Sequence, residues 1–149
     1  MKYNIAQLNI AKLKAPLDHP SIHGFVSKLD EINALAESSP GFVWRLKEEG
    51  GSAVNISVFN DESLIVNMSV WESIEDLKKF VYNSGHVKVY LQKDSWFHKP
   101  EEPHMVLWWT KENEIPDIFE ALARLKYLQR KGTSKYAFTF KDIYDAPQI

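Results

Sequence analysis

The stretch Leu64-Ile-Val-Asn-Met-Ser-Val-Trp71 constrains the fold of this chain most strongly. It is apolar at nearly every position except Asn67 and Ser69, which is typical of a strand covered on both faces. Ser73 follows as a helix cap, with Asp76 three residues further on in the place of the usual capping-box Glu. The sequence therefore predicts a buried strand that turns straight into a helix. The inner stripe of that amphipathic helix consists of Ile74, Leu77, Phe80 and Val81.

Further periodic segments predict an α+β fold in a single domain, residues 1–149. The order is β-α-β-β-α-β followed by an extra α-β pair, the split βαβ pattern of a ferredoxin-like antiparallel sheet with helices on one face. Two interpretations remain for residues 48–63, a long hairpin loop or an extra edge strand. A turn at Gly85 ends or kinks the second helix. We expect the other strands over residues 5–13, 42–46, 105–110 and 136–144, and the other helices over residues 20–36 and 116–130.

Composition excludes several classes of protein. The net charge of −2, with scattered basic residues, gives no electrostatic footprint for nucleic acid or an anionic membrane. The chain has no cysteine, which excludes disulfides, thiol nucleophiles and thiolate metal sites. No segment approaches about 18 consecutive apolar residues, and the first residues lack the features of a signal peptide. We therefore expect a cytoplasmic protein without a membrane or nucleic-acid partner.

The apolar pattern also bears on self-association. Helices on one face of the sheet leave the other face to be covered by something else. Because the strands at residues 64–71 and 105–110 are apolar on both sides, a twin sheet from a second copy is the simplest cover. The sequence thus predicts a homodimer.

Three polar side chains, Asn9, Asn67 and Ser69, lie on strands whose neighbours we expect to be buried. A buried amide without a partner costs roughly 1–3 kcal/mol. These side chains therefore either hydrogen-bond within the fold or line a wet cavity, where Asn9 and Asn67 orient a polar group of a ligand. Flat walls for such a cavity are available from Trp71, Trp96, Trp108 and Trp109, although tryptophans on strands also serve as core residues.

His86 is the titratable group of greatest interest. In an unbroken helix His86 lies about 180° from Leu77 and faces solvent, at roughly 100° of rotation per residue. If Gly85 breaks the helix, His86 begins a new one, where the positive dipole end favours the neutral imidazole that binds metal. Tyr90, one turn further along, shares its face.

The segment from Asn67 to Tyr90 resembles the strand-to-helix junction of the dimeric α/β-barrel superfamily, which contains antibiotic-biosynthesis monooxygenase-like enzymes and haem-binding relatives. Together with Trp108-Trp109 and Ala137-Phe-Thr-Phe140, it looks like an uncharacterised bacterial family of that superfamily. The run from Gly85 to Phe97 is also similar to the spheroidene monooxygenases. The resemblance implies a homodimer with a cavity between sheet and helices for a flat molecule or haem, with His86 as iron ligand or proton-transfer group.

The chain departs from the haem-degrading members of that superfamily. Those proteins use an Asn on the first strand, a Trp inside the second helix and a His near its end. Asn9 matches the first, but Phe80 and Tyr90 fall near the other two positions. The resemblance therefore disfavours haem degradation and leaves haem binding through His86 open, beside a protein with no cofactor.

Three functional hypotheses follow. The first is a monooxygenase-like pocket for a hydrophobic molecule, shaped by Trp71, Trp108 and Phe80, with His86 and Asn9 in the chemistry. The second is a non-catalytic ligand-binding or dimerisation module without a cofactor. The third is a divalent-metal enzyme centred on His98 and His104, which flank two glutamates.

Overall fold

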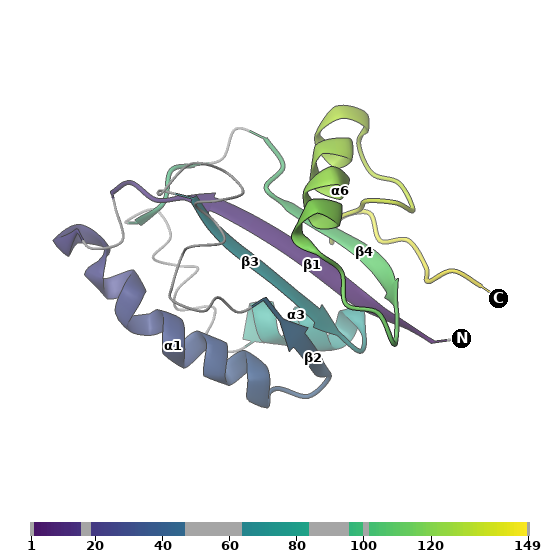
Figure 1. Ribbon diagram of the computed structural model, residues 1–149, viewed down its shortest axis with the longest axis horizontal. Coiled ribbons are helices and arrows are strands. Elements are labelled where there is room, and N and C mark those ends of the chain that lie inside the picture. Colours follow the sequence, from purple (N-terminus) through teal and green to yellow (C-terminus); the bar gives the residue numbers. More distant parts are fainter. Residues whose placement is uncertain (1, 16–18, 47–63, 84–95, 100–101, 149) are drawn as a thin grey trace.

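The computed structural model describes residues 2–15, 19–46, 64–83, 96–99 and 102–148, and Figure 1 shows the arrangement of their elements. Four strands form one antiparallel sheet in the order β2-β3-β1-β4. This is the ferredoxin-like order that the split βαβ pattern predicts. In chain order the elements are β1 (Tyr3–Lys12), the 3₁₀ turn η1 (Pro20–Ile22), α1 (His23–Ser38), β2 (Phe42–Arg45), β3 (Leu64–Trp71), α3 (Ile74–Asn83), β4 (Met105–Lys111) and α6 (Ile118–Lys131).

Local sequence signals account for the ends of several elements. The Ser73 hydroxyl accepts a hydrogen bond from the Asp76 backbone N–H at 3.1 Å, which confirms the predicted cap of α3. Helix α6 begins after Asp117, whose Oδ1 accepts from the Glu120 N–H at 2.8 Å, and it ends at Gly132 with φ 80°. That positive φ is one that glycine adopts without strain.

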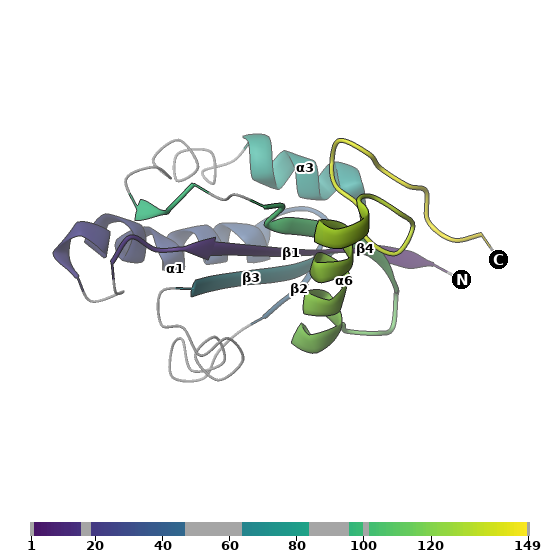
Figure 2. The same ribbon diagram turned by 90° about the horizontal axis from the view of Figure 1, so that it is seen from above.

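Helices cover both faces of the sheet, as Figure 2 shows for α3 and α6. Helices α1 and α3 pack on the face that carries Ile5 and Trp71. Helix α6 packs on the opposite face, over Ala6 and Trp108. The burial of β1 and β4 on this second face therefore has a cover within the chain and does not require a twin sheet.

The predicted last strand over residues 136–144 is wrong. This segment contains only isolated bridges, Leu107 to Phe138 and Thr139 to Asp142. Leu107 and Phe138 exchange both backbone hydrogen bonds at 2.8 and 2.9 Å, so the tail closes the free edge of β4 at one point. Residues after α6 thus run around that edge, and Phe138 joins the core under α1 and α3.

Candidate functional site

A group of polar side chains interrupts the apolar face of the sheet that α1 and α3 cover. Alternate residues of a strand share a face, so Gln7 and Asn9 of β1 lie on the same side as Ile5. Gln7 is paired in register with Ser69, and Asn9 with Asn67. These four side chains, which we call the polar band, form two adjacent pairs in the middle of the sheet.

The polar band is held by hydrogen bonds between side chains. Gln7 Nε2 donates to Asn67 Oδ1 at 2.5 Å and to Ser69 Oγ at 2.8 Å. The Trp71 indole Nε1 also donates to Ser69 Oγ, at 2.9 Å. Gln7 and Ser69 are buried, with 5% and 7% of their surface exposed. The network therefore links the core around Trp71 to the more open end of the polar band.

The other pair of the polar band is less satisfied. Asn67 is exposed, so solvent reaches it. Asn9 Oδ1 is buried and has no hydrogen-bond partner among the described residues. A buried carbonyl oxygen without a donor costs about 1–3 kcal/mol, a cost that folds carry when the group has another role. An amide of this kind is suited to accept a hydrogen bond from a guest molecule.

Apolar clusters flank the polar band on both sides along the strands. On the side toward the start of α3, the cluster is built around Trp71, Ile5 and Leu77. On the other side, Leu13, Phe25 and Trp96 form a second cluster beneath α1. A polar strip between two apolar, aromatic-containing clusters is the usual composition of a small-molecule site.

The aromatic residues of the first cluster pack on one another. Phe80 of α3 stacks on Trp71 with ring centroids 5.1 Å apart, and Phe42 meets Trp71 edge-on at 5.5 Å. Trp71 is fully buried, so it supports the polar band from below through its indole N–H and offers no open ring face. Phe80 is half-buried and lies nearer the surface.

Trp96 and Trp108 occupy different places from Trp71. Trp96 is buried against Phe25, with ring centroids 5.7 Å apart, at the far end of the polar band. Trp108 lies on the other face of the sheet, beneath α6. The first hypothesis, in which Trp71 and Trp108 bound a single pocket, is therefore wrong on this point, because the sheet separates the two rings.

The predicted iron ligand His86 and its neighbour Tyr90 lie outside the described residues. The four other histidines, at positions 19, 23, 98 and 104, are all exposed. No group of three His, Asp or Glu side chains with metal-binding geometry occurs among the residues that the structure describes. The described part of the chain therefore places no axial ligand for haem iron and no divalent-ion site at the polar band.

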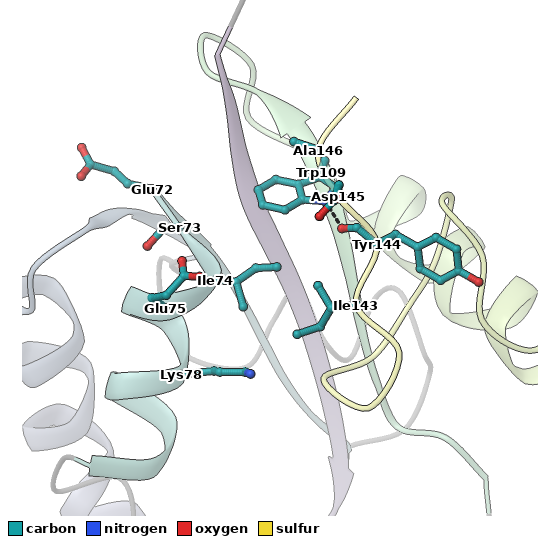
Figure 3. A pocket seen from close by; sticks show the side chains of 10 residues that line it. All are labelled: Glu72, Ser73, Ile74, Glu75, Lys78, Trp109, Ile143, Tyr144, Asp145 and Ala146. Atoms are coloured by element: carbon teal, nitrogen blue, oxygen red, sulfur yellow. Dashed lines mark hydrogen bonds between the residues drawn. The ribbon is translucent and has the colours of Figure 1, made fainter. Parts of the chain in front are cut away.

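A cavity of about 340 Å³ lies elsewhere, on the surface where α3 begins. Figure 3 shows its lining, in which the side chains of Ile74 and Lys78 of α3 point toward Ile143 of the tail. Trp109, one of the tryptophans predicted to form a flat wall, also lines the cavity and donates its indole N–H to the Tyr144 carbonyl at 2.8 Å. The other predicted site residues that the structure describes do not line this cavity, which is distinct from the polar band.

Gln7 is the site residue that the sequence reasoning missed, although it forms the centre of the network. The signal was present. Gln7 stands two positions before Asn9 in an alternating strand, so both side chains point to the same face.

Comparison with known proteins identifies the fold. The family described as "Domain of unknown function (DUF3291)" matches residues 4–149. No curated protein matches the chain at a significant level. Within the described residues, no helix is both long and apolar enough to cross a membrane.

Solved structures resemble the chain at low sequence identity. A protein of unknown function from Nitrosomonas europaea, NE2512, is 10% identical, with a TM-score of 0.52 over 77% of this chain and 96% of that one. PA3566 from Pseudomonas aeruginosa is 10% identical, with a TM-score of 0.50 over 76% and 98%. SnoaB, a cofactor-independent oxygenase from Streptomyces nogalater, is 16% identical, with a TM-score of 0.48 over 76% and 98%. The likenesses to NE2512 and PA3566 show the fold and not a reaction, and they confirm the predicted α+β architecture.

Proposed function

The chain belongs to the DUF3291 domain family, and from that premise we propose that it binds an apolar, ring-bearing small molecule between its sheet and helices α1 and α3. The polar band is the observation that carries this proposal. Its buried amide oxygen on Asn9 lacks a donor within the described chain, and Asn67 beside it is open to solvent. A ligand with an O–H or N–H group satisfies Asn9, while its apolar part lies against the flanking clusters.

The residues of the proposed site have separate tasks. Gln7 and Ser69 fix the position of Asn67 through the hydrogen bonds of the polar band. Asn9 and Asn67 bind and orient the polar group of the ligand. Phe80 and Trp96 contribute apolar surface at the two ends. The resemblance of the segment from Asn67 to Tyr90 to monooxygenase-like enzymes supports oxidation of the bound molecule as the reaction class.

Haem does not fit the described residues as a cofactor. Binding of haem iron requires an axial ligand such as an imidazole, and every described histidine is exposed. The polar band contains neutral amides and a hydroxyl, none of which ligates haem iron in the known classes. His86, which lies outside the described residues, is the ligand that the sequence predicts for haem iron. If His86 binds haem iron, titration with hemin should shift the Soret band for the wild-type protein and not for His86→Ala. An equal shift in both proteins shows that His86 is not the ligand.

Binding of a neutral aromatic amide tests the proposed function. We expect 2-naphthamide to bind the protein in isothermal titration calorimetry. Asn67→Ala should weaken this binding about fivefold, because one neutral hydrogen bond contributes about 1 kcal/mol. Asn113→Ala removes an exposed amide from the turn after β4 and serves as the matched control, with unchanged affinity. Absence of binding, or equal binding by all three proteins, contradicts the proposal.

One observation favours a second function, that of a non-catalytic module. The protein's own rings pack on Trp71, with Phe80 stacked on it and Phe42 meeting it edge-on. If the same holds over the whole polar band, the aromatic residues serve packing alone. Absence of binding by 2-naphthamide, with a folded protein, is the result that this alternative predicts.

We also propose a homodimer, in which the contact surface is smaller than the whole sheet face that the sequence analysis assigned to it. Helix α6 covers β1 and β4, while Trp44, Leu46 and Val66, toward the β2 edge of the same face, are only partly buried. We propose that a second copy packs on this margin. A dimer mass in light scattering at micromolar concentration supports the proposal, and a monomer at all concentrations contradicts it.

A further inference from the structure

Arg45 extends the polar band by one strand. Arg45 of β2 is paired in register with Ser69, and Ser69 with Gln7, so the three residues form one row across the sheet. The Arg45 Nε donates to Glu37 Oε1 of α1 at 2.8 Å. Since α1 lies over the same face as the polar band, this bond holds the guanidinium on that face of the sheet. A cation therefore stands at the edge of an otherwise neutral group of amides.

The hydrogen bonds that Ser69 accepts leave its hydroxyl hydrogen without a hydrogen-bond partner among the described residues. A serine hydroxyl has one donor hydrogen and two acceptor lone pairs. Both lone pairs of Ser69 Oγ accept, one from Gln7 Nε2 and one from the Trp71 indole. The hydroxyl hydrogen is thus left to donate, and it makes no hydrogen bond to a described residue. Ser69 presents a donor in the same row as the Arg45 guanidinium.

Arg45 also has donors to spare. Its Nε is bonded to Glu37, and its Nη1 makes one long bond of 3.4 Å to the Leu46 carbonyl. Nη2 makes no hydrogen bond to any described residue. The side chain is partly buried, with 22% exposed, so its position is defined while its outer nitrogens stay accessible. The planar fork of a guanidinium matches the two oxygens of a carboxylate.

We propose that the ligand of this site carries, besides the O–H or N–H group that Asn9 accepts, a carboxylate on its apolar ring system, and that this carboxylate is bound by the Arg45 guanidinium and the Ser69 hydroxyl. This inference rests on the proposed function, because it concerns the same site and names the class of its ligand. Two donors at neighbouring register positions, one of them cationic, select an anionic acceptor. Glu37 holds the guanidinium in place and at the same time competes with the ligand for it.

Two probes with the same ring system test the inference, 2-naphthoate and 2-naphthamide, each titrated calorimetrically against the protein. We expect the wild-type protein to bind 2-naphthoate about tenfold more tightly, since a hydrogen bond to a charged group contributes about 1.5–3 kcal/mol. Arg45→Gln should abolish this preference by weakening 2-naphthoate about tenfold, with 2-naphthamide unchanged. Arg130→Gln, at an exposed position on α6, is the control and should change neither affinity.

Glu37→Gln separates ligand binding from the structural effect of the ion pair. This variant breaks the same ion pair as Arg45→Gln but keeps the guanidinium, so it should bind 2-naphthoate at least as tightly as the wild type. A loss of 2-naphthoate binding in Glu37→Gln that equals the loss in Arg45→Gln shows that only the ion pair matters, and it overturns the inference. Circular dichroism of both variants confirms that they fold.

The outcomes also separate this inference from the function beneath it. If 2-naphthamide binds in an Asn67-dependent way and 2-naphthoate is not preferred, the inference fails and the proposed function stands. If neither compound binds, both fail. If Arg45→Gln weakens both compounds equally, Arg45 supports the fold of the site and does not select a carboxylate.

Discussion

The two faces of the sheet differ in what they bury, although they are made by the same strands. Leu8 and Met68 face α6 and are almost completely buried in an apolar core. Asn9 and Asn67, their immediate neighbours in the sequence, face α1 and α3 and belong to the polar band. The two faces therefore have different tasks: one stabilises the fold, and the other carries the proposed ligand site. The α6 face provides the dry core, and the opposite face gives up part of its core for polar groups.

Buried polar atoms without a partner among the described residues occur on both faces: Asn9 Oδ1 in the polar band, and Asn4 Oδ1 and Trp108 Nε1 on the α6 face. An apolar side chain in place of a buried, unpartnered amide usually leaves a protein as stable or more so. Within the polar band this argument applies to Asn9, whose Oδ1 has no partner among the described residues, and the proposed ligand binding accounts for its retention. Three substitutions, from the largest expected effect to the smallest, test this division.

Leu8→Ala should have the largest effect, because Leu8 is fully buried beneath α6. Truncation of a buried leucine costs about 2–5 kcal/mol. We expect a loss in that range in the free energy of unfolding measured by urea denaturation. Ile10→Ala, on the same face of β1 but only partly buried, is the control and should lose less. Equal losses at the two positions contradict the account of a dry core centred under α6.

Asn9→Leu should act in the opposite direction. Leucine has nearly the shape of asparagine but removes the buried oxygen that lacks a donor. We expect the free energy of unfolding to rise by about 1 kcal/mol, while binding of 2-naphthamide is lost. Denaturation and calorimetry on the same sample measure both quantities. A destabilised variant shows that Asn9 serves the fold, which removes the argument from the polar band.

Asp117→Ala should have a smaller effect, confined to stability. Loss of an N-cap side chain costs about 1 kcal/mol, and the cap of α6 lies on the face away from the polar band. Thermal unfolding should detect the change, and the affinity for 2-naphthamide should be unaltered. Ser73→Ala removes the corresponding cap of α3, on the face of the polar band, and a change of affinity only in this second variant sharpens the comparison.

The fold was predictable where local signals agree with one another. The strand at residues 64–71 was predicted with its observed bounds, since continuous apolarity gives way directly to the Ser73 cap. The strand over residues 136–144 was not, because its alternation of aromatic and polar residues also fits a tail that turns back after one bridge. An alternating pattern predicts which side chains point to the same face, but it does not show whether a partner strand is present.

The site was predictable only in part, for a related reason. The polar character of Asn9, Asn67 and Ser69 was evident from their apolar neighbours, and parity along one strand extends the set to Gln7. Whether Trp71 and Trp108 share a face depends on the register between strands, which sequence alone does not give. The pairing of Ile5 with both Trp71 and Trp109 puts Trp108 on the other side. The position of α6 could not be predicted for a similar reason. The amphipathic pattern shows that one side of the helix is buried, but it does not show which face of the sheet the helix covers.

The side-chain amide signals in a ¹⁵N–¹H spectrum test the central claim most directly. Titration with 2-naphthamide should shift the amide signals of Gln7, Asn9 and Asn67 together, while those of Asn113 and Gln129, outside the polar band, stay in place. A titration in which the polar band signals do not move, or in which all amide signals move alike, contradicts the assignment of the polar band as the binding site.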